Sequence, residues 1–114
     1  MTTTFTAEQL AHFVGHDGSP IYISVKGNVY DCTTGSNFYG QDGPYKCFAG
    51  KEVSRGLAKM ILTGEEDNSG WDNLSEQHMS TLNGWVEKFN SKYPVVGTFQ
   101  PDPEFKSRGE KFDP

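Results

Sequence analysis

The sequence predicts an α+β domain, with one small sheet and helices gathered at one end of it. An apolar alternation typical of a β-hairpin occurs early in the chain, and two later segments repeat apolar residues at helical spacing. A short β-rich segment follows the second of them. The chain has 114 residues, the size of one domain with one modest core, and no internal repeat divides it.

A short helix is predicted near the start, over residues 7–13. Thr6 can cap its first turn, and Gln9, three positions later, completes a capping box. Phe5 and Leu10 have the spacing of a hydrophobic staple across the same turn. Glycine and proline residues then separate this helix from the next element.

A β-hairpin is predicted next. Apolar residues alternate over residues 21–26, which is the pattern of a half-buried strand. Gly27-Asn28 can form a two-residue turn, and residues 29–32 then supply the second strand. The pattern therefore predicts two antiparallel strands that are joined at Gly27-Asn28.

Residues 33–50 are rich in glycine and aromatic side chains, which predicts a shaped loop region in place of a long helix or strand. Such loops hold functional side chains more often than regular elements do. Tyr39 and Tyr45 lie here, six positions apart. On composition and periodicity alone, both tyrosines are predicted to be structural, with buried rings and hydroxyls hydrogen-bonded to the backbone.

Two further helices are predicted. The first covers residues 52–62 and has an apolar side and a polar side, with Arg55 on the polar side. The acidic stretch 64–70 that follows is predicted to be a solvated loop. The second helix begins at a Ser75 cap, and its apolar residues recur at helical spacing: Met79, Leu82, Val86 and Phe89.

A closing strand is predicted over residues 94–99, which ends the folded domain 1–99. Residues 100–114 are rich in proline and charged side chains and poor in apolar ones. A segment of this composition buries little apolar surface. We therefore predict a flexible charged tail over residues 100–114.

Composition excludes several classes of function. The net charge is −5 and no basic stripe occurs, so nucleic acid is not expected as a partner. No apolar run approaches the roughly 20 residues of a membrane span, so this chain is expected to be soluble and cytoplasmic. Cys32 and Cys47 are expected to be reduced thiols, and the scattered histidines give no zinc-site spacing.

Several motifs carry a resemblance to a known family. The central stretches are Phe38-Tyr39-Gly40, Gly43-Pro44-Tyr45, Phe48-Ala49-Gly50-Lys51 and Ser54-Arg55-Gly56-Leu57-Ala58. Phe5 to Leu10 resembles the opening of the same family, and Lys92-Tyr93 with Val96-Gly97 resembles its closing motif. Together these stretches are similar to the membrane-associated progesterone receptor family, in one register over residues 5–98.

The resemblance implies a cytochrome b5-like fold that binds haem b without the two histidine ligands of cytochrome b5. It implies that Tyr45 is the axial ligand of the haem iron, and that Tyr39, Lys92 and Tyr93 lie around the haem, supporting the ligand or the propionates. It further implies a protein that is not an enzyme. Such a protein supports haem-thiolate monooxygenases or sterol metabolism, or carries haem, in association with the endoplasmic reticulum membrane.

The chemistry of tyrosine agrees with this assignment. A free phenol ionises only near pH 10, so a phenolate at neutral pH needs the iron's charge or donated hydrogen bonds to lower its pKa. An anionic oxygen favours ferric over ferrous iron. Since no second histidine is expected opposite Tyr45, the iron would be five-coordinate with an open face. Such a face also motivates the hypothesis of a haem-mediated homodimer.

Other interpretations stay open at this point. The same aromatic cleft could bind a steroid-like or other apolar ligand, or serve as a protein-interaction adaptor, without haem. Enzymatic catalysis is not supported by any paired nucleophile and base, phosphate loop or metal cluster. Cys47 could ligate iron or respond to oxidants, although a small buried cysteine is the commoner case. Trp85 is predicted to lie in the core, whereas Trp71 could cover an edge or meet a partner.

Overall fold

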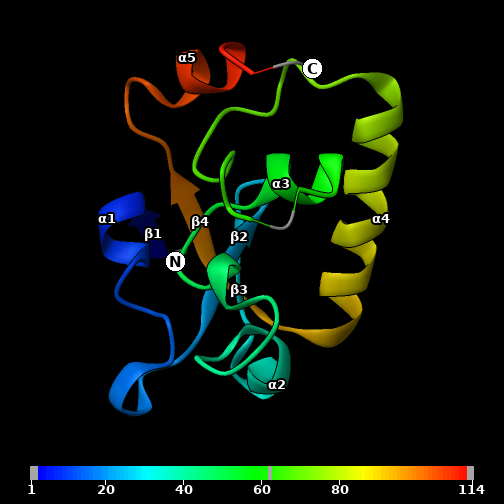
Figure 1. The fold of residues 1–114 in the computed structure, drawn as a ribbon. Coiled ribbons are helices and arrows are strands. Elements are labelled where there is room, and N and C mark those ends of the chain that lie inside the picture. Colours follow the sequence, from blue (N-terminus) through cyan, green and yellow to red (C-terminus); the bar gives the residue numbers. More distant parts are fainter. Residues whose placement is uncertain (1–2, 62, 113–114) are drawn as a thin grey trace.

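The computed structural model describes residues 3–61 and 63–112, which form a four-stranded sheet with helices around it (Figure 1). The strands are β1 (Thr3–Thr6), β2 (Tyr22–Val25), β3 (Asn28–Asp31) and β4 (Val95–Gln100). The α-helices are α1 (Ala7–Leu10), α2 (Ser36–Tyr39), α3 (Ser54–Lys59), α4 (Glu76–Lys92) and α5 (Phe105–Glu110). Three 3-10 turns join them: η1 (His16–Gly18), η2 (Thr33–Gly35) and η3 (Lys46–Phe48). The α+β architecture predicted from the sequence is confirmed.

The sheet order is β1-β4-β3-β2. β2 pairs with β3 and β3 pairs with β4 in the antiparallel sense, whereas β1 lies parallel to β4. Strand β1 was not predicted, because a four-residue segment with one apolar residue, Phe5, shows no alternating pattern of its own. It forms because it pairs with the other end of the chain, with Phe5 opposite Phe99.

The hairpin is confirmed, but its turn lies one residue earlier than predicted. Val25 pairs with Asn28, so the two turn residues are Lys26 and Gly27. Both have positive φ, 49° at Lys26 and 78° at Gly27. A tight hairpin turn of this kind requires a left-handed backbone at both positions, and glycine meets that requirement at the second.

Helix α1 begins as predicted and ends earlier. The side chain of Thr6 accepts a hydrogen bond from the Gln9 backbone and the Gln9 side chain accepts one from Thr6, so the capping box is confirmed. The helix stops at Leu10 in place of residue 13. The chain turns there because the Phe13 carbonyl accepts a hydrogen bond from the Tyr22 amide, which draws this segment to the hairpin.

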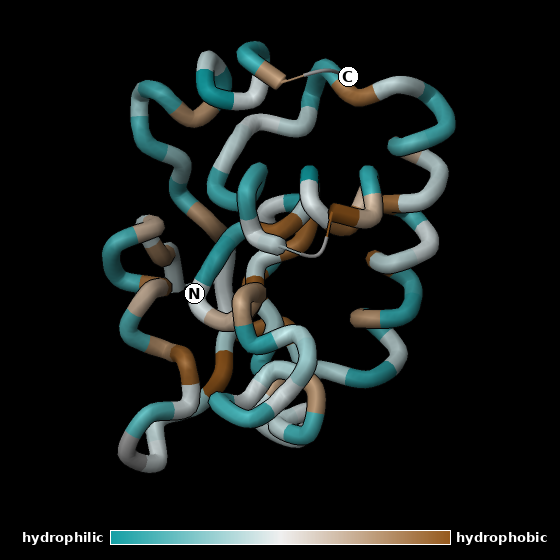
Figure 2. The backbone as a smooth tube through the Cα atoms, viewed as in Figure 1, coloured by the Kyte–Doolittle hydropathy of each residue, from teal (hydrophilic) through white to brown (hydrophobic). Residues whose placement is uncertain are grey.

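The buried apolar residues form two clusters, and Figure 2 shows the hydrophobic positions along the backbone. The larger cluster lies between the sheet, α3 and α4 and includes Ile23, Val25, Tyr30, Val53, Leu57, Leu82 and Phe89. The smaller one joins Leu10, Val29 and Phe99. The apolar stripe of α4 therefore contributes Leu82 and Phe89 to the core beside α3, and Ser75 caps the helix as predicted by accepting from the His78 amide.

Helix α3 is buried on its polar side too, which contradicts the two-sided pattern predicted for residues 52–62. Arg55 is 0% exposed. Its guanidinium pairs with Glu66 at 2.7 Å and donates to the Gly70 carbonyl at 3.0 Å and to Asn73 Oδ1 at 2.6 Å. The sequence pattern places Arg55 on a polar helix face. It does not show that residues 66–73 supply the groups that pair with its guanidinium.

The acidic stretch 64–70 is correspondingly not a solvated loop. Glu66 is 5% exposed because it is the carboxylate that pairs with Arg55, and with Lys59 at 2.9 Å. Ser69 and Gly70 are also buried. The prediction of a solvated loop was wrong because the acidic composition of the stretch does not show that Arg55 and Lys59 pair with Glu66 in the fold.

Residues 100–112 do not form the free tail that we predicted. Helix α5 packs against the domain, with the Phe105 ring 5.5 Å from Phe99. Arg108 Nη2 donates to the Asn68 carbonyl at 2.8 Å, and the Phe112 carbonyl accepts from Arg55 at 3.3 Å. The segment carries few apolar residues, but its polar groups satisfy buried partners in the domain.

Asp67 introduces a pH dependence into this buried region. Both carboxylate oxygens are buried and have no hydrogen-bond partner within the part of the chain that the structure describes. Burial raises the pKa of Asp67 to about 7, although Lys51 opposes this change. The folded protein therefore retains a proton between about pH 4 and pH 7 that the unfolded chain releases, so this residue makes stability fall as pH rises through that window.

Asp67→Asn is expected to remove that slope and to raise the free energy of unfolding at pH 8 by about 2–4 kcal/mol, because the amide needs no proton to remain neutral. Urea denaturation at pH 5 and pH 8 measures both effects. The exposed Asp42→Asn serves as the matched control. A wild-type-like pH slope in Asp67→Asn would show that Asp67 is not the titrating group.

Candidate functional site

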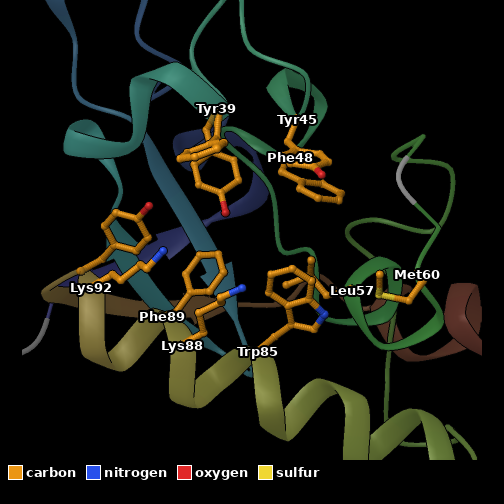
Figure 3. A pocket seen from close by; sticks show the side chains of 11 residues that line it. Tyr39, Tyr45, Phe48, Leu57, Met60, Trp85, Lys88, Phe89 and Lys92 are labelled. Carbon is orange, nitrogen blue, oxygen red and sulfur yellow. The ribbon is translucent and has the colours of Figure 1, made fainter.

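A pocket of about 250 Å³ lies between α4 and the aromatic segment 38–48 (Figure 3). Its walls are Phe38, Tyr39, Tyr45, Phe48, Leu57, Met60, Trp85, Lys88, Phe89, Lys92 and Tyr93. Phe48, Leu57 and Phe89 are buried and continuous with the core. Phe38 and Met60 are 49% and 55% exposed, so part of the lining reaches solvent. It is therefore an apolar recess with an exposed edge.

Helix α4 forms one wall because its pocket residues recur at helical spacing. Trp85, Lys88, Phe89 and Lys92 follow the i, i+3, i+4, i+7 spacing of one helix face. Tyr93 is the C-cap residue of the same helix. The other wall comes from α2 and η3, where Tyr45 is the residue that precedes the 3-10 turn.

The structure brings together all four residues that the family resemblance singles out. Tyr39, Tyr45, Lys92 and Tyr93 line this one pocket, although the first two are far from the last two in the sequence. The ring centroid of Tyr39 is 6.3 Å from that of Tyr45 and 6.4 Å from that of Tyr93. Tyr39 therefore lies between the other two phenols.

Gly35 allows this arrangement. A Cβ atom at this position would lie 2.5 Å from the Tyr93 hydroxyl and 3.3 Å from the Tyr39 ring. Only a residue without a side chain leaves room for both tyrosines. The glycine-rich composition of the loop region, noted from the sequence, thus has a direct role in shaping the site.

The electrostatics of the pocket combine neutral donors inside with cations at the rim. Burial raises the pKa of Tyr39 well above its ordinary value, and the neighbouring Tyr93 adds to this effect. Burial likewise raises the pKa of Tyr93. Both phenols are therefore protonated at neutral pH and can donate hydrogen bonds. The rim residues Lys88 and Lys92 are exposed.

The other candidates from the sequence lie elsewhere. None of the described residues that line the pocket is a histidine or a cysteine. His16 Nδ1 contacts Gln41 Nε2 at 2.8 Å, and Cys47 is half-buried outside the lining. Within residues 3–61 and 63–112, no group of three His, Cys, Asp or Glu side chains could hold a metal ion. The described lining does contain other groups that can ligate a metal ion, which are the phenols of Tyr39, Tyr45 and Tyr93 and the Met60 thioether.

Two pocket residues on α4 were not identified as site residues from the sequence. Trp85 was predicted to lie in the core; it packs against the core but is half-buried and also forms part of the pocket wall. Lys88 is exposed and also lines the pocket. The spacing of Trp85, Lys88 and Lys92 on one helix face contains the signal, since Lys92 was already a candidate. Trp71 lies outside this pocket, with the Lys26 ammonium 5.9 Å from its ring.

The fold and the pocket define a class of protein, a small α+β domain with a recess suited to a flat apolar ligand. A family model described as "Cytochrome b5-like Heme/Steroid binding domain" matches residues 6–99. The chain belongs to this family, and within it to the membrane-associated progesterone receptor family.

The relatives support this membership. The chain is 51% identical over 94 residues to "Probable steroid-binding protein 3" of Arabidopsis thaliana, covering 82% of this chain and 94% of the relative. It is 40% identical over 96 residues to membrane-associated progesterone receptor component 2 of Homo sapiens, covering 82% of this chain and 43% of the relative. It is 37% identical over 100 residues to a cytochrome P450 regulator of Schizosaccharomyces pombe, covering 82% of this chain and 60% of the relative. The chain thus spans less than two thirds of the length of the latter two relatives.

A solved structure confirms the fold. A protein from Arabidopsis thaliana, described as having a cytochrome b5 like fold, matches with a TM-score of 0.78 and 47% identity, covering 86% of this chain and 91% of that chain. The cytochrome b5-like fold predicted from the sequence is therefore correct. Among the helices of the described residues, none has the length and apolar character needed to cross a bilayer.

Proposed function

We propose that this chain is a haem-binding protein in which the Tyr45 phenolate is the axial ligand of a five-coordinate haem b. The observation that carries the proposal is the convergence of Tyr39, Tyr45, Lys92 and Tyr93 on one apolar pocket. Family membership supports it, since the matching family is described as binding haem or steroid.

The residues present fit haem. Flat aromatic and aliphatic side chains, among them Phe48, Leu57 and Phe89, offer the apolar contact that a porphyrin ring needs. Haem supplies a ferric iron whose positive charge favours an oxygen anion as ligand. Tyr45 provides such an oxygen, and Lys92 provides a cation for a propionate. Tyr45 therefore suits the iron at the centre of haem, and Lys92 suits the propionates at its edge.

Tyr39 and Tyr93 have supporting roles in this proposal. Their phenols are protonated at neutral pH, as an ordinary tyrosine is, and burial raises both pKa values further. A protonated phenol donates a hydrogen bond, and such a bond stabilises a neighbouring phenolate. Tyr39, whose ring lies 6.3 Å from that of Tyr45, is the nearer candidate donor by ring position.

We further infer a role without catalysis of its own: support of haem-thiolate monooxygenases or sterol metabolism, or carriage of haem, in the cytoplasm or at the endoplasmic reticulum membrane. The printed name of the Schizosaccharomyces pombe relative, a cytochrome P450 regulator, supports this inference. An open iron face would also allow two haem-loaded copies to associate. Comparing the sedimentation of apo and holo protein tests that association.

A second candidate is binding of a steroid or another apolar ligand without haem. The observation that favours it is the apolar lining of the pocket, together with relatives that are named steroid-binding proteins. In this case Tyr39 or Tyr93 would donate a hydrogen bond to an oxygen of the ligand, and the lysines at the rim would have no charged partner.

Titration of the purified chain with ferric haem, and separately with progesterone, tests the two candidates. We expect saturable haem binding at one site per chain with a high-spin ferric visible spectrum. Progesterone binding in the absence of any haem uptake would favour the second candidate. A six-coordinate, low-spin spectrum would contradict Tyr45 as the single axial ligand.

A further inference from the structure

Lys88 is a residue of the pocket wall for which neither the family description nor the resemblance provides a role. It lies four positions before Lys92 on α4, so the two side chains are neighbours on one helix face. Both line the pocket, and Figure 3 shows both extending from the pocket side of α4. The edge of the pocket formed by this helix therefore carries two positive charges one turn apart.

Packing directs Lys88 toward the pocket. Its ammonium lies 5.0 Å from the centroid of the Trp85 ring, which is itself a wall residue. A cation over an aromatic face is attracted by the ring, and the aliphatic part of the side chain can lie along the apolar surface. The ammonium is thereby held at the boundary between the apolar recess and solvent.

The charge balance at this edge is incomplete. The ion pairs formed by the described residues involve Arg55, Lys59, Lys106 and Arg108, and neither Lys88 nor Lys92 takes part in one. No acidic side chain is among the described residues that line the pocket. In a protein with a net charge of −5, this makes a locally positive edge that is complementary to an anionic group.

The size of the pocket also matters. Its volume of about 250 Å³ is below the roughly 300–1,000 Å³ that is usual for small-molecule sites. A porphyrin-sized ligand bound here would extend beyond the recess, and its polar edge would lie in the partly solvated zone of the rim. Two carboxylates on that edge would meet the two ammonium groups.

We propose that Lys88 and Lys92 together bind the two carboxylates of a planar apolar ligand, and that Lys88 selects a dianionic ligand over a neutral one. This inference rests on the proposed function, because haem carries two propionates on one edge. A neutral steroid has no carboxylate to form an ion pair with either ammonium. Lys88 is a specificity residue and makes no bond to the iron.

The test compares Lys88→Gln with wild type against two probes, ferric haem and ferric haem dimethyl ester, whose carboxylates are blocked. We expect the dissociation constant for haem to rise about two- to five-fold, as for the loss of one exposed ion pair. The constant for the ester is expected to be unchanged. Lys88→Arg is expected to restore wild-type haem affinity, and the difference between wild type and Lys88→Gln is expected to shrink at high salt.

Lys106→Gln is the matched control, because it makes the same change in net charge on α5, outside the pocket. Equal haem affinity of Lys88→Gln and wild type, or equal weakening for haem and ester, overturns the role of Lys88 and leaves the proposed function intact. Failure of the wild-type chain to bind either probe overturns the proposed function, and this inference with it.

Discussion

Tyr45→Phe is expected to weaken ferric haem binding by about 100-fold or more and to abolish the spectrum of a phenolate-ligated iron. Loss of an outer-shell partner of a metal ligand commonly costs 10–100-fold in affinity, so loss of the ligand itself should cost at least the upper value. The phenylalanine ring keeps the stacked contact with Phe48, where the ring centroids are 6.1 Å apart. The substitution therefore removes the oxygen and little of the packing.

Affinity and the visible spectrum, measured in one titration series, test this expectation. Tyr22→Phe is the matched control, since Tyr22 packs on Phe13 outside the pocket and loses the same atom. We expect the control to bind haem as wild type does. Unchanged affinity and spectrum in Tyr45→Phe would mean that another residue ligates the iron.

Arg55→Met is expected to lower the free energy of unfolding by about 3–5 kcal/mol, the usual cost of breaking a buried ion pair by removing one partner. The substitution leaves Glu66 buried with only part of its positive environment, and it removes donors from the Gly70 and Phe112 carbonyls. A domain of this size has a total stability of about 5–15 kcal/mol. The variant should therefore be close to the limit of folding at 37 °C.

Urea denaturation of Arg55→Met and of Arg108→Met measures this difference. Arg108 also donates to a backbone carbonyl, that of Asn68, but its side chain is 35% exposed. Arg108→Met is expected to lower the free energy of unfolding by no more than about 1 kcal/mol, as for the loss of an exposed ion pair. Losses of equal size in the two variants would show that burial of Arg55 is not the decisive factor.

Elements with a local signal could be predicted from the sequence. The capping box at Thr6 and Gln9, the Ser75 cap and the helical stripe of α4 depend on residues within one or two turns. The hairpin also has a local signal. Its turn was misplaced by one residue because Lys26 adopts a positive φ that its residue type does not indicate.

Features that depend on distant partners could not be predicted in the same way. β1 exists because it pairs with β4 from the other end of the chain. Arg55 is buried because residues 66–73 and the C-terminal segment surround it with acceptors. Helix α5 is held by the packing of Phe105 on Phe99 and by the hydrogen bond from Arg108 to the Asn68 carbonyl. Composition describes each of these segments as polar, and only the three-dimensional arrangement shows that their polar groups satisfy one another.

The candidate site depends both on local sequence motifs and on contacts between distant segments. Periodicity alone favoured a structural role for Tyr39 and Tyr45, and it was the family resemblance that pointed to them as site residues. Their convergence with Lys92 and Tyr93 on one pocket is a result of the fold. Lys88 could have been found from its four-residue spacing to Lys92, had the pocket-facing side of α4 been known.

The proposed haem site depends on a bond between the Tyr45 phenolate and the haem iron. The most direct test is the resonance Raman spectrum of the ferric haem complex prepared with ordinary tyrosine and with ring-deuterated tyrosine. We expect phenolate vibrations that shift on labelling and disappear in Tyr45→Phe. A spectrum without tyrosine-dependent bands, or one that is unchanged in Tyr45→Phe, would contradict it.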